Sequence, residues 1–161
     1  MAATHVQRVL QTAAQPSGCT NFKLRQLLRA VARHYDAEMA RAGLKGTQYS
    51  LLSHLVRLEP VQPVELARLM GLDASTLTRN LRVLIDLGWV TQGPGGDARS
   101  RLIRTTPAGK AKQAEARRYW KKAQAGLSER LGAEKIAALH VLIDHGLAQL
   151  GDEDAEQSND A

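Results

Sequence analysis

The chain has 161 residues, of which 43% are apolar, so it suits one domain with a buried core. Its formal net charge is +6, but five of its 16 acids fall in residues 151–161, which we expect to form a disordered acidic tail. Residues 1–150 hold 22 basic and 11 acidic side chains, a net charge of +11. This excess indicates a polyanionic partner, usually nucleic acid, and the alternative is a merely solvated surface.

The chain has one cysteine, which excludes an internal disulfide, and its five histidines are too scattered to predict a metal site. We expect no metal and no cofactor. There is no signal peptide and no run near the ~18 apolar residues of a membrane helix, so we expect a cytoplasmic protein without membrane contact.

Two helices are expected first, after a flexible arm at residues 1–18. The first helix starts at Cys19 and ends at Gly43. Its apolar residues recur every three or four positions: Leu24, Leu27, Leu28, Val31, Tyr35 and Met39. The second helix has Thr47 as its expected N-cap and stops before Pro60.

The next two helices have the spacing of a helix–turn–helix. Pro63 suits the first turn of a helix, Ala67 is small enough for close helix packing, and Gly71 allows the chain to turn. A shared core is predicted for Leu66, Leu72, Leu77 and Leu81. The opposite side of the second helix is polar, with Ser75, Arg79, Arg82 and Asp86 in its centre and Thr76 and Thr78 on its flanks.

A β-hairpin and two long helices are expected next. The strands WVTQ (89–92) and RLIRT (101–105) enclose the turn-rich loop GPGGDARS. Pro107 opens a helix that reaches about Leu131, with an interruption near Gly126. The last helix has apolar residues at Ile136, Leu139, Ile143, Leu147 and Leu150. The predicted fold class is mainly α with a small β-hairpin wing, in the order α-α-α-α-β-β-α-α.

The polar helix face and the hairpin together predict a surface for double-stranded DNA. The second helix of a helix–turn–helix lies in the major groove, where arginine reads guanine and hydroxyls bond bases or phosphates. The candidate residues on it are Ser75, Thr76, Thr78, Arg79 and Arg82. In the hairpin, Arg99 can enter the minor groove, Asp97 can hold its guanidinium, and Arg101 adds charge. The alternative is a helical hairpin with a solvated polar face.

Three segments resemble the MarR family of bacterial winged-helix regulators: TQYSLLSHL (47–55), ELARLMGLDASTLTRNLRVLIDLGWV (65–90) and GGDARSRLIRTTPAGK (95–110). The third is the most specific, because it joins an Asp-x-Arg wing, a basic strand and T-P-A-G. The resemblance covers about residues 19–150. It implies a winged helix–turn–helix at 47–106 and dimerisation helices at 19–46 and 107–150. It also implies a homodimeric, non-enzymatic regulator, most often a repressor, on a pseudo-palindromic operator.

The apolar stripes of the first and last helices exceed what one small winged helix needs. They favour a second copy as partner, which would hold two recognition helices roughly 34–36 Å apart, although the stripes can also pack within one chain. The resemblance further implies a small aromatic carboxylate or phenol as effector. Its candidate contacts are Asn21, Arg25, Tyr49 and His54, each with a structural role as the alternative.

The opening CTNFKLRQL…HYD is similar to a subgroup of repressors that control the catabolism of aromatic acids such as nicotinate. This implies 6-hydroxynicotinate as the effector. The effector would release the protein from its operator by binding more tightly to the conformer that does not bind DNA.

Three other functions are compared with this interpretation. The first is a repressor that senses peroxides through Cys19, which lies near the start of the first helix, close to Lys23 and Arg25. Peroxide-sensing relatives have a reactive cysteine in this region. Alignment places their cysteine near Asn21, however, which favours a Cys19 that does not sense peroxide. A winged-helix module that binds DNA without sequence preference, or binds protein, is the second. An enzyme is the third, and no catalytic set or phosphate-cradling loop supports it.

Overall fold

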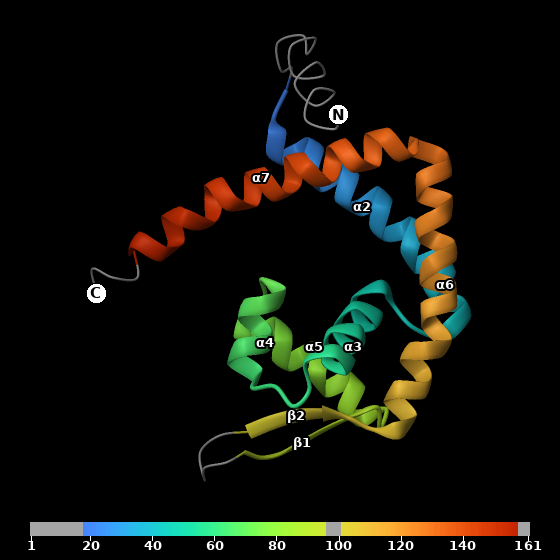
Figure 1. Cartoon of the computed structure of the whole chain (residues 1–161), viewed down its shortest axis with the longest axis vertical. Coiled ribbons are helices and arrows are strands. Elements are labelled where there is room, and N and C mark those ends of the chain that lie inside the picture. Colours follow the sequence, from blue (N-terminus) through green and yellow to red (C-terminus); the bar gives the residue numbers. More distant parts are fainter. Residues whose placement is uncertain (1–17, 96–100, 158–161) are drawn as a thin grey trace. The chain divides into compact units, whose positions relative to one another are not determined.

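The computed structural model describes residues 18–95 and 101–157, with side chains described up to residue 150 (Figure 1). Its elements in chain order are α2 (Thr20–Met39), the 3-10 turn η1 (Ala40–Ala42), α3 (Gly46–Leu58), α4 (Pro63–Met70), α5 (Ala74–Asp86), β1 (Val90–Pro94), β2 (Arg101–Thr105), α6 (Pro107–Leu131) and α7 (Ala133–Gln157). The expected order of helices and hairpin strands is therefore confirmed. The described residues divide into two compact units, one with 18–28 and 125–157 and the other with 29–95 and 101–124.

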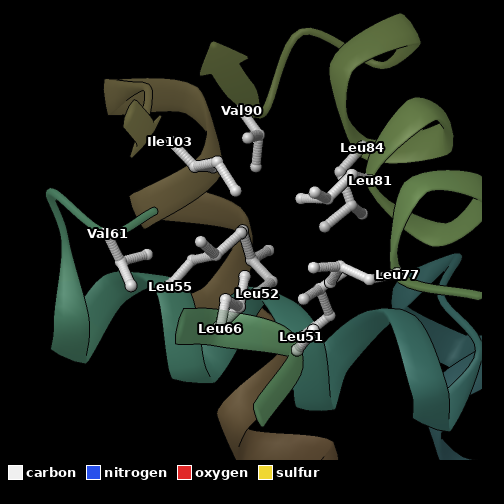
Figure 2. Close-up of a cluster of buried hydrophobic side chains, with 11 residues drawn as sticks. Leu51, Leu52, Leu55, Val61, Leu66, Leu77, Leu81, Leu84, Val90 and Ile103 are labelled. Carbon is white, nitrogen blue, oxygen red and sulfur yellow. The ribbon is translucent and has the colours of Figure 1, made fainter. Parts of the chain in front are cut away.

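One apolar core holds the helix–turn–helix and the hairpin together in the larger unit (Figure 2). Helices α3, α4 and α5 and the two strands all contribute to it, through Leu51, Leu52, Leu55, Val61, Leu66, Ala67, Leu77, Leu81, Leu84, Val90 and Ile103. Burying one such aliphatic side chain contributes about 1.5–3 kcal/mol. Because three leucines of α5 are used in this core, the polar side of α5 is turned to solvent.

The turn between α4 and α5 forms as the sequence predicts. Pro63 occupies the first turn of α4, where a missing N–H costs nothing. Gly71 ends α4 with φ 60°, a left-handed conformation that favours glycine. Its N–H bonds the Arg68 carbonyl at 3.2 Å, and the next N–H, of Leu72, bonds the Ala67 carbonyl at 2.9 Å. This tight turn sets the direction in which α5 leaves α4.

The hairpin is antiparallel, with Val90 opposite Thr105 and Pro94 opposite Arg101. A third short piece of chain joins it, because Val61 pairs with Ile103 as an isolated bridge. The wing is thus attached on one edge of β2 to β1 and on the other to the α3–α4 linker.

A second buried cluster lies in the same unit and contains Met39, Ala42, Leu44, Tyr49 and Ala116. Three aromatic residues pack against it: Trp89, Tyr119 and Trp120. Since Trp89 also packs against the first core, it connects the start of the hairpin to both clusters.

The structure corrects two expected boundaries. The N-cap of α3 is Lys45 and not Thr47, because Asp36 on α2 accepts the Gly46 N–H at 2.7 Å and the Gln48 side chain accepts the Lys45 N–H at 2.8 Å. Helix α6 runs from Pro107 to Leu131 without the interruption expected at Gly126, since a single glycine costs a helix only about 1 kcal/mol.

Helix α7 continues beyond Leu150 to Gln157, so residues 151–157 of the predicted disordered tail are helical. Glutamate, alanine and glutamine in this stretch favour the helix, whereas its glycine and two aspartates do not.

The smaller unit leaves large apolar side chains exposed. On the start of α2 these are Phe22, Leu24, Leu27 and Leu28, and on α7 they are Val141, Leu142, Ile143, Leu147 and Leu150. Across residues 18–95 and 101–157, no helix is both long and apolar enough to cross a membrane.

Candidate nucleic-acid interface

The interface starts at the N-cap of α5, which is Asp73. Its carboxylate accepts the Thr76 backbone N–H at 2.7 Å, the Thr76 hydroxyl at 2.7 Å and the Ser75 hydroxyl at 2.6 Å. The Ser75 hydroxyl and the two Thr76 donors stabilise the charged form and hold the pKa of Asp73 far below its ordinary value. A short acceptor followed at two and three positions by hydroxyl residues is a signal of this cap in the sequence.

Three hydroxyls predicted to contact DNA donate their protons inside the helix. Ser75 and Thr76 donate to Asp73, and Thr78 donates to the Ala74 carbonyl at 2.7 Å. A hydroxyl has one proton and two lone pairs, so each of these oxygens remains an acceptor. Acceptors suit the amino groups of adenine and cytosine, and not guanine O6 and N7 or a phosphate.

Arg79 is the unpaired donor of this helix face. Its side chain is exposed, and no residue in the described part of the chain forms a hydrogen bond or ion pair with its guanidinium. Arg82, the other arginine of the face, donates its Nε to both carboxylate oxygens of Asp86, at 3.0 and 3.3 Å. Both partners of this pair are more than half exposed, and exposed pairs of this spacing contribute only about 0.3–0.5 kcal/mol. The pair can therefore open towards a phosphate.

The described part of the wing adds two further arginines. Arg101 and Arg104 are exposed on β2, while Ile103 and Thr105 between and beside them are buried. Arg104 was not among the predicted contacts, although the alternation of RLIRT indicates its solvent-facing position. The predicted Asp97 and Arg99 lie outside the residues that the structure describes.

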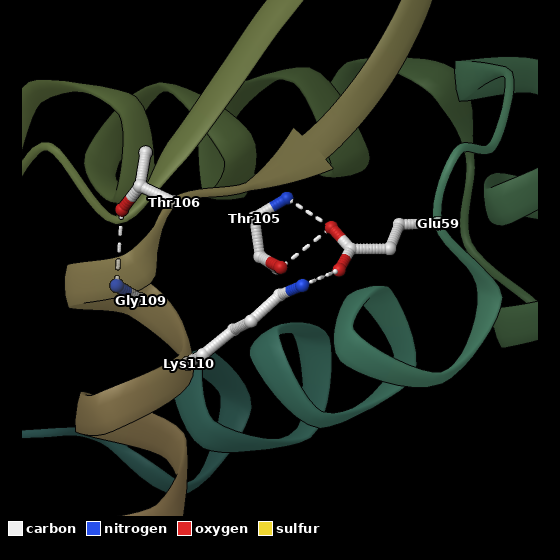
Figure 3. Close-up of polar contacts among 5 residues, drawn as sticks. All are labelled: Glu59, Thr105, Thr106, Gly109 and Lys110. Carbon is white, nitrogen blue, oxygen red and sulfur yellow. Dashed lines mark hydrogen bonds and ion pairs between the residues drawn. The ribbon is translucent and has the colours of Figure 1, made fainter.

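A polar network fixes the base of the wing (Figure 3). Glu59, the C-cap of α3, accepts both the backbone N–H and the hydroxyl of Thr105, the hydroxyl at 2.5 Å, and pairs with Lys110 Nζ at 2.7 Å. Next to it, the Thr106 hydroxyl donates to the Gly88 carbonyl at 2.8 Å and accepts the Gly109 N–H at 3.0 Å. The sequence does not indicate this role of Glu59, because its partner Thr105 is 46 residues away along the chain.

The four candidate effector contacts fall in both compact units. Asn21 and Arg25 lie on α2 in the smaller unit, where the Asn21 side chain accepts from Arg25 Nε at 3.1 Å. Tyr49 and His54 lie on α3 in the larger unit. Tyr49 is a core residue beside Trp120, with ring centroids 6.3 Å apart, and half-buried His54 bonds the Ser50 carbonyl at 2.8 Å.

Cys19 directly precedes α2 and is exposed. Its carbonyl accepts the Lys23 N–H at 3.1 Å, so the residue takes part in the first turn of the helix. Within the described ranges, no group of three or more histidine, cysteine, aspartate or glutamate side chains is placed to hold a metal ion.

Comparison with known proteins agrees with this architecture. A family model described as MarR family matches residues 42–100. The chain is 28% identical over 93 residues to YwoH of Bacillus subtilis, named an uncharacterized HTH-type transcriptional regulator, covering 58% of this chain and 68% of that protein.

Two solved structures show a similar fold. MosR, a transcriptional regulator of M. tuberculosis solved in complex with DNA, has a TM-score of 0.70 and 29% identity, covering 86% of this chain and 98% of MosR. A mutant MarR of E. coli complexed with operator DNA has a TM-score of 0.73 and 23% identity, covering 79% of this chain and 92% of MarR. At that identity, the likeness to MarR shows the fold alone.

The matched residues 42–100 include α3, α4, α5 and β1, which are the elements that place the polar face of α5. The fold and these relatives define the class as winged-helix transcription regulators, not enzymes. Over residues 42–100 the chain is thus similar to the MarR family, as its helix–turn–helix segment indicated.

Proposed function

We propose that the protein binds an operator in duplex DNA as a homodimer, with α5 in the major groove and the wing against the neighbouring minor groove. The observation that carries this proposal is the division of α5 into two faces. Leu77, Leu81 and Leu84 are buried in the core, whereas Arg79 on the other side is exposed and has no partner in the described chain. An unpaired guanidinium on a rigid helix is the usual donor to guanine.

Charge supports the same partner. The net charge of +11 over residues 1–150 gives a long-range attraction to phosphates. MosR, which is 29% identical to this chain, was solved in complex with DNA. We propose that Ser75, Thr76, Thr78, Arg79 and Arg82 contact the major groove, and that Asp97, Arg99 and Arg101 form the contact of the wing.

The exposed apolar residues of α2 and α7 support the homodimer. Leu28 is 67% exposed, Leu147 65% and Leu150 70% in the single chain, which is costly for aliphatic side chains in water. A second copy that covers both helices removes this surface from water and places two α5 helices on one duplex. In this proposal residues 19–46 and 107–150 dimerise, and residues 47–106 bind DNA.

The operator can be found by selecting bound sequences from a random pool of duplexes and footprinting the result. A dimer predicts a two-fold symmetric site with half-sites about 10 bp apart. Arg79→Ala should then lower the affinity about tenfold or more, since one bidentate base contact is worth about 1–3 kcal/mol. Arg117→Ala, an exposed arginine on α6, is the matched control. A pool without any enriched sequence would instead support the non-specific module.

We further propose that the protein is a repressor of the subgroup that controls aromatic-acid catabolism, released by a small aromatic carboxylate such as 6-hydroxynicotinate. Exposed Arg25 supports this: among the described residues only its Nε is bonded, to Asn21, and its other guanidinium donors can meet a carboxylate. Half-buried His54 is a second candidate, with one ring nitrogen not bonded to Ser50. Buried Tyr49 is the least accessible of the four candidates.

A thermal-shift screen of aromatic carboxylates tests the effector, because a ligand of the folded state raises the melting temperature. 6-Hydroxynicotinate should raise it and release the selected operator in a gel shift. Arg25→Ala should abolish both effects, while Arg29→Ala, one turn further on the same helix and also exposed, should retain them. No shift with any member of the screen would refute this effector class.

A further inference from the structure

The outer edge of β2 is held by the linker between α3 and α4. Val61 and Ile103 exchange two backbone hydrogen bonds, with N–O distances of 2.9 and 3.3 Å. Two residues further along β2, the Thr105 N–H points to the same edge, where the Glu59 carboxylate accepts it. The carboxylate therefore continues the bridge by one more bond, in place of a backbone carbonyl.

The same carboxylate reaches a third element. Its other oxygen pairs with Lys110 in the first turn of α6, and only 15% of the Glu59 side chain is exposed (Figure 3). Burial opposes ionisation of Glu59, but the bonds from Lys110 and Thr105 outweigh it, so its pKa lies below the ordinary value. One ionised side chain thus joins the end of α3, the strand β2 and the start of α6.

This position matters for the wing because a two-stranded hairpin has little stability of its own. Its direction relative to α5 depends on what holds its base. Arg101 and Arg104, the exposed cations of the described wing, lie on the strand that Glu59 holds. A change in the direction of β2 would move both guanidinium groups relative to Arg79.

We propose that Glu59 is a positioning residue for DNA binding, which sets the direction of the wing so that its arginines and α5 meet the same duplex. The inference rests on the proposed function, and it adds a residue that does not itself touch DNA. It predicts that Glu59 acts on affinity only through the arginines of β2.

Glu59→Gln tests this, because glutamine has one acceptor oxygen and its amide N–H₂ cannot accept from Lys110 or Thr105. The affinity for the selected operator should fall about tenfold, the effect of one lost arginine contact. The matched control is Glu115→Gln, which breaks a pair with half-buried Lys112 within α6 and should leave the affinity unchanged. If Glu59→Gln does not fold, Thr105→Val removes one of the three bonds and should lower the affinity in the same direction.

A double-mutant cycle separates positioning from general stability. In an Arg101→Ala/Arg104→Ala background, Glu59→Gln should have little further effect on operator affinity. An equal loss in both backgrounds, or no loss in the wild-type background, overturns the inference while the proposed function stands. If the wild-type protein binds no duplex at all, the proposed function is refuted, and the inference that rests on it is refuted too.

Discussion

Gly109 is the glycine, among those that the structure describes, where an added methyl group would meet other atoms most closely. It lies buried in the first turn of α6, and a Cβ atom added there would be 2.0 Å from the Trp89 carbonyl oxygen and 2.9 Å from its carbon. Ordinary contacts of a Cβ begin near 3.4 Å, so helix and chain would have to separate by more than 1 Å. The opposing atoms are backbone, and no rotamer change can relieve the clash.

The loss of stability can be estimated from the hydrogen bonds that such a separation would break. The Trp89 carbonyl also accepts the Thr106 N–H at 3.0 Å, and the Thr106 hydroxyl accepts the Gly109 N–H. Overpacking costs about 1–3 kcal/mol and each lost hydrogen bond about 0.5–1.5 kcal/mol, while alanine returns about 1 kcal/mol of helix propensity. Gly109→Ala should therefore destabilise the fold by about 2–4 kcal/mol, or lower the melting temperature by about 5–15 °C.

Thermal and urea unfolding followed by circular dichroism measure this effect. Gly146→Ala is the control, because it makes the same substitution inside a helix where an added Cβ meets nothing within 4 Å. It should leave stability unchanged or raise it by up to about 1 kcal/mol. If Gly109→Ala melts at the temperature of the wild type, the close approach of α6 to the hairpin is wrong.

Three further predictions concern acid stability, assembly and the DNA-facing helix. Glu59 and Asp73 have folded-state pKa values below their ordinary 4.5 and 3.8, so the stability they contribute is present above those values and is lost as the pH falls through the folded ones. The melting temperature should therefore drop below about pH 4.5, and a rise on acidification would contradict both networks. Leu147→Glu should convert a dimer to monomers in sedimentation, whereas Val64→Glu, 79% exposed on α4, should not, and a dimer that survives Leu147→Glu must use another surface. Asp86→Asn frees Arg82, so it should raise the affinity for unrelated duplexes at low salt and steepen the salt dependence of binding by about one charge. Equal affinities of the variant and the wild type would show that this end of α5 lies away from DNA.

The order of elements was predictable because local signals act independently at each boundary. Apolar spacing gave the buried side of α5, and Gly71 and Pro63 marked the turn and the helix start that the structure shows. The sequence signal for the Asp73 cap is equally local. The structure adds that the Ser75 and Thr76 hydroxyls donate their protons to Asp73, so that they can only accept hydrogen bonds from DNA.

Contacts between distant segments were not predictable from one sequence. Thr47 is a good N-cap by propensity, but Asp36, ten residues from Gly46, supplies the acceptor instead. In the sequence, Glu59 has the pattern of an ordinary charged residue before a proline. Its contact with Thr105 forms only in the folded chain. Both errors have one cause, because a polar group bonds whichever donor the tertiary packing places next to it.

If α5 reads bases through Arg79, the preference for the operator over other DNA must depend on this side chain. Wild type and Arg79→Ala are each titrated by fluorescence anisotropy with the selected operator and with a duplex of the same composition in scrambled order, at one fixed salt concentration. We expect the wild type to prefer the operator at least a hundredfold and the variant to lose about tenfold or more of that preference while its affinity for the scrambled duplex changes little. A variant that keeps the full preference of the wild type would show that another surface reads the DNA.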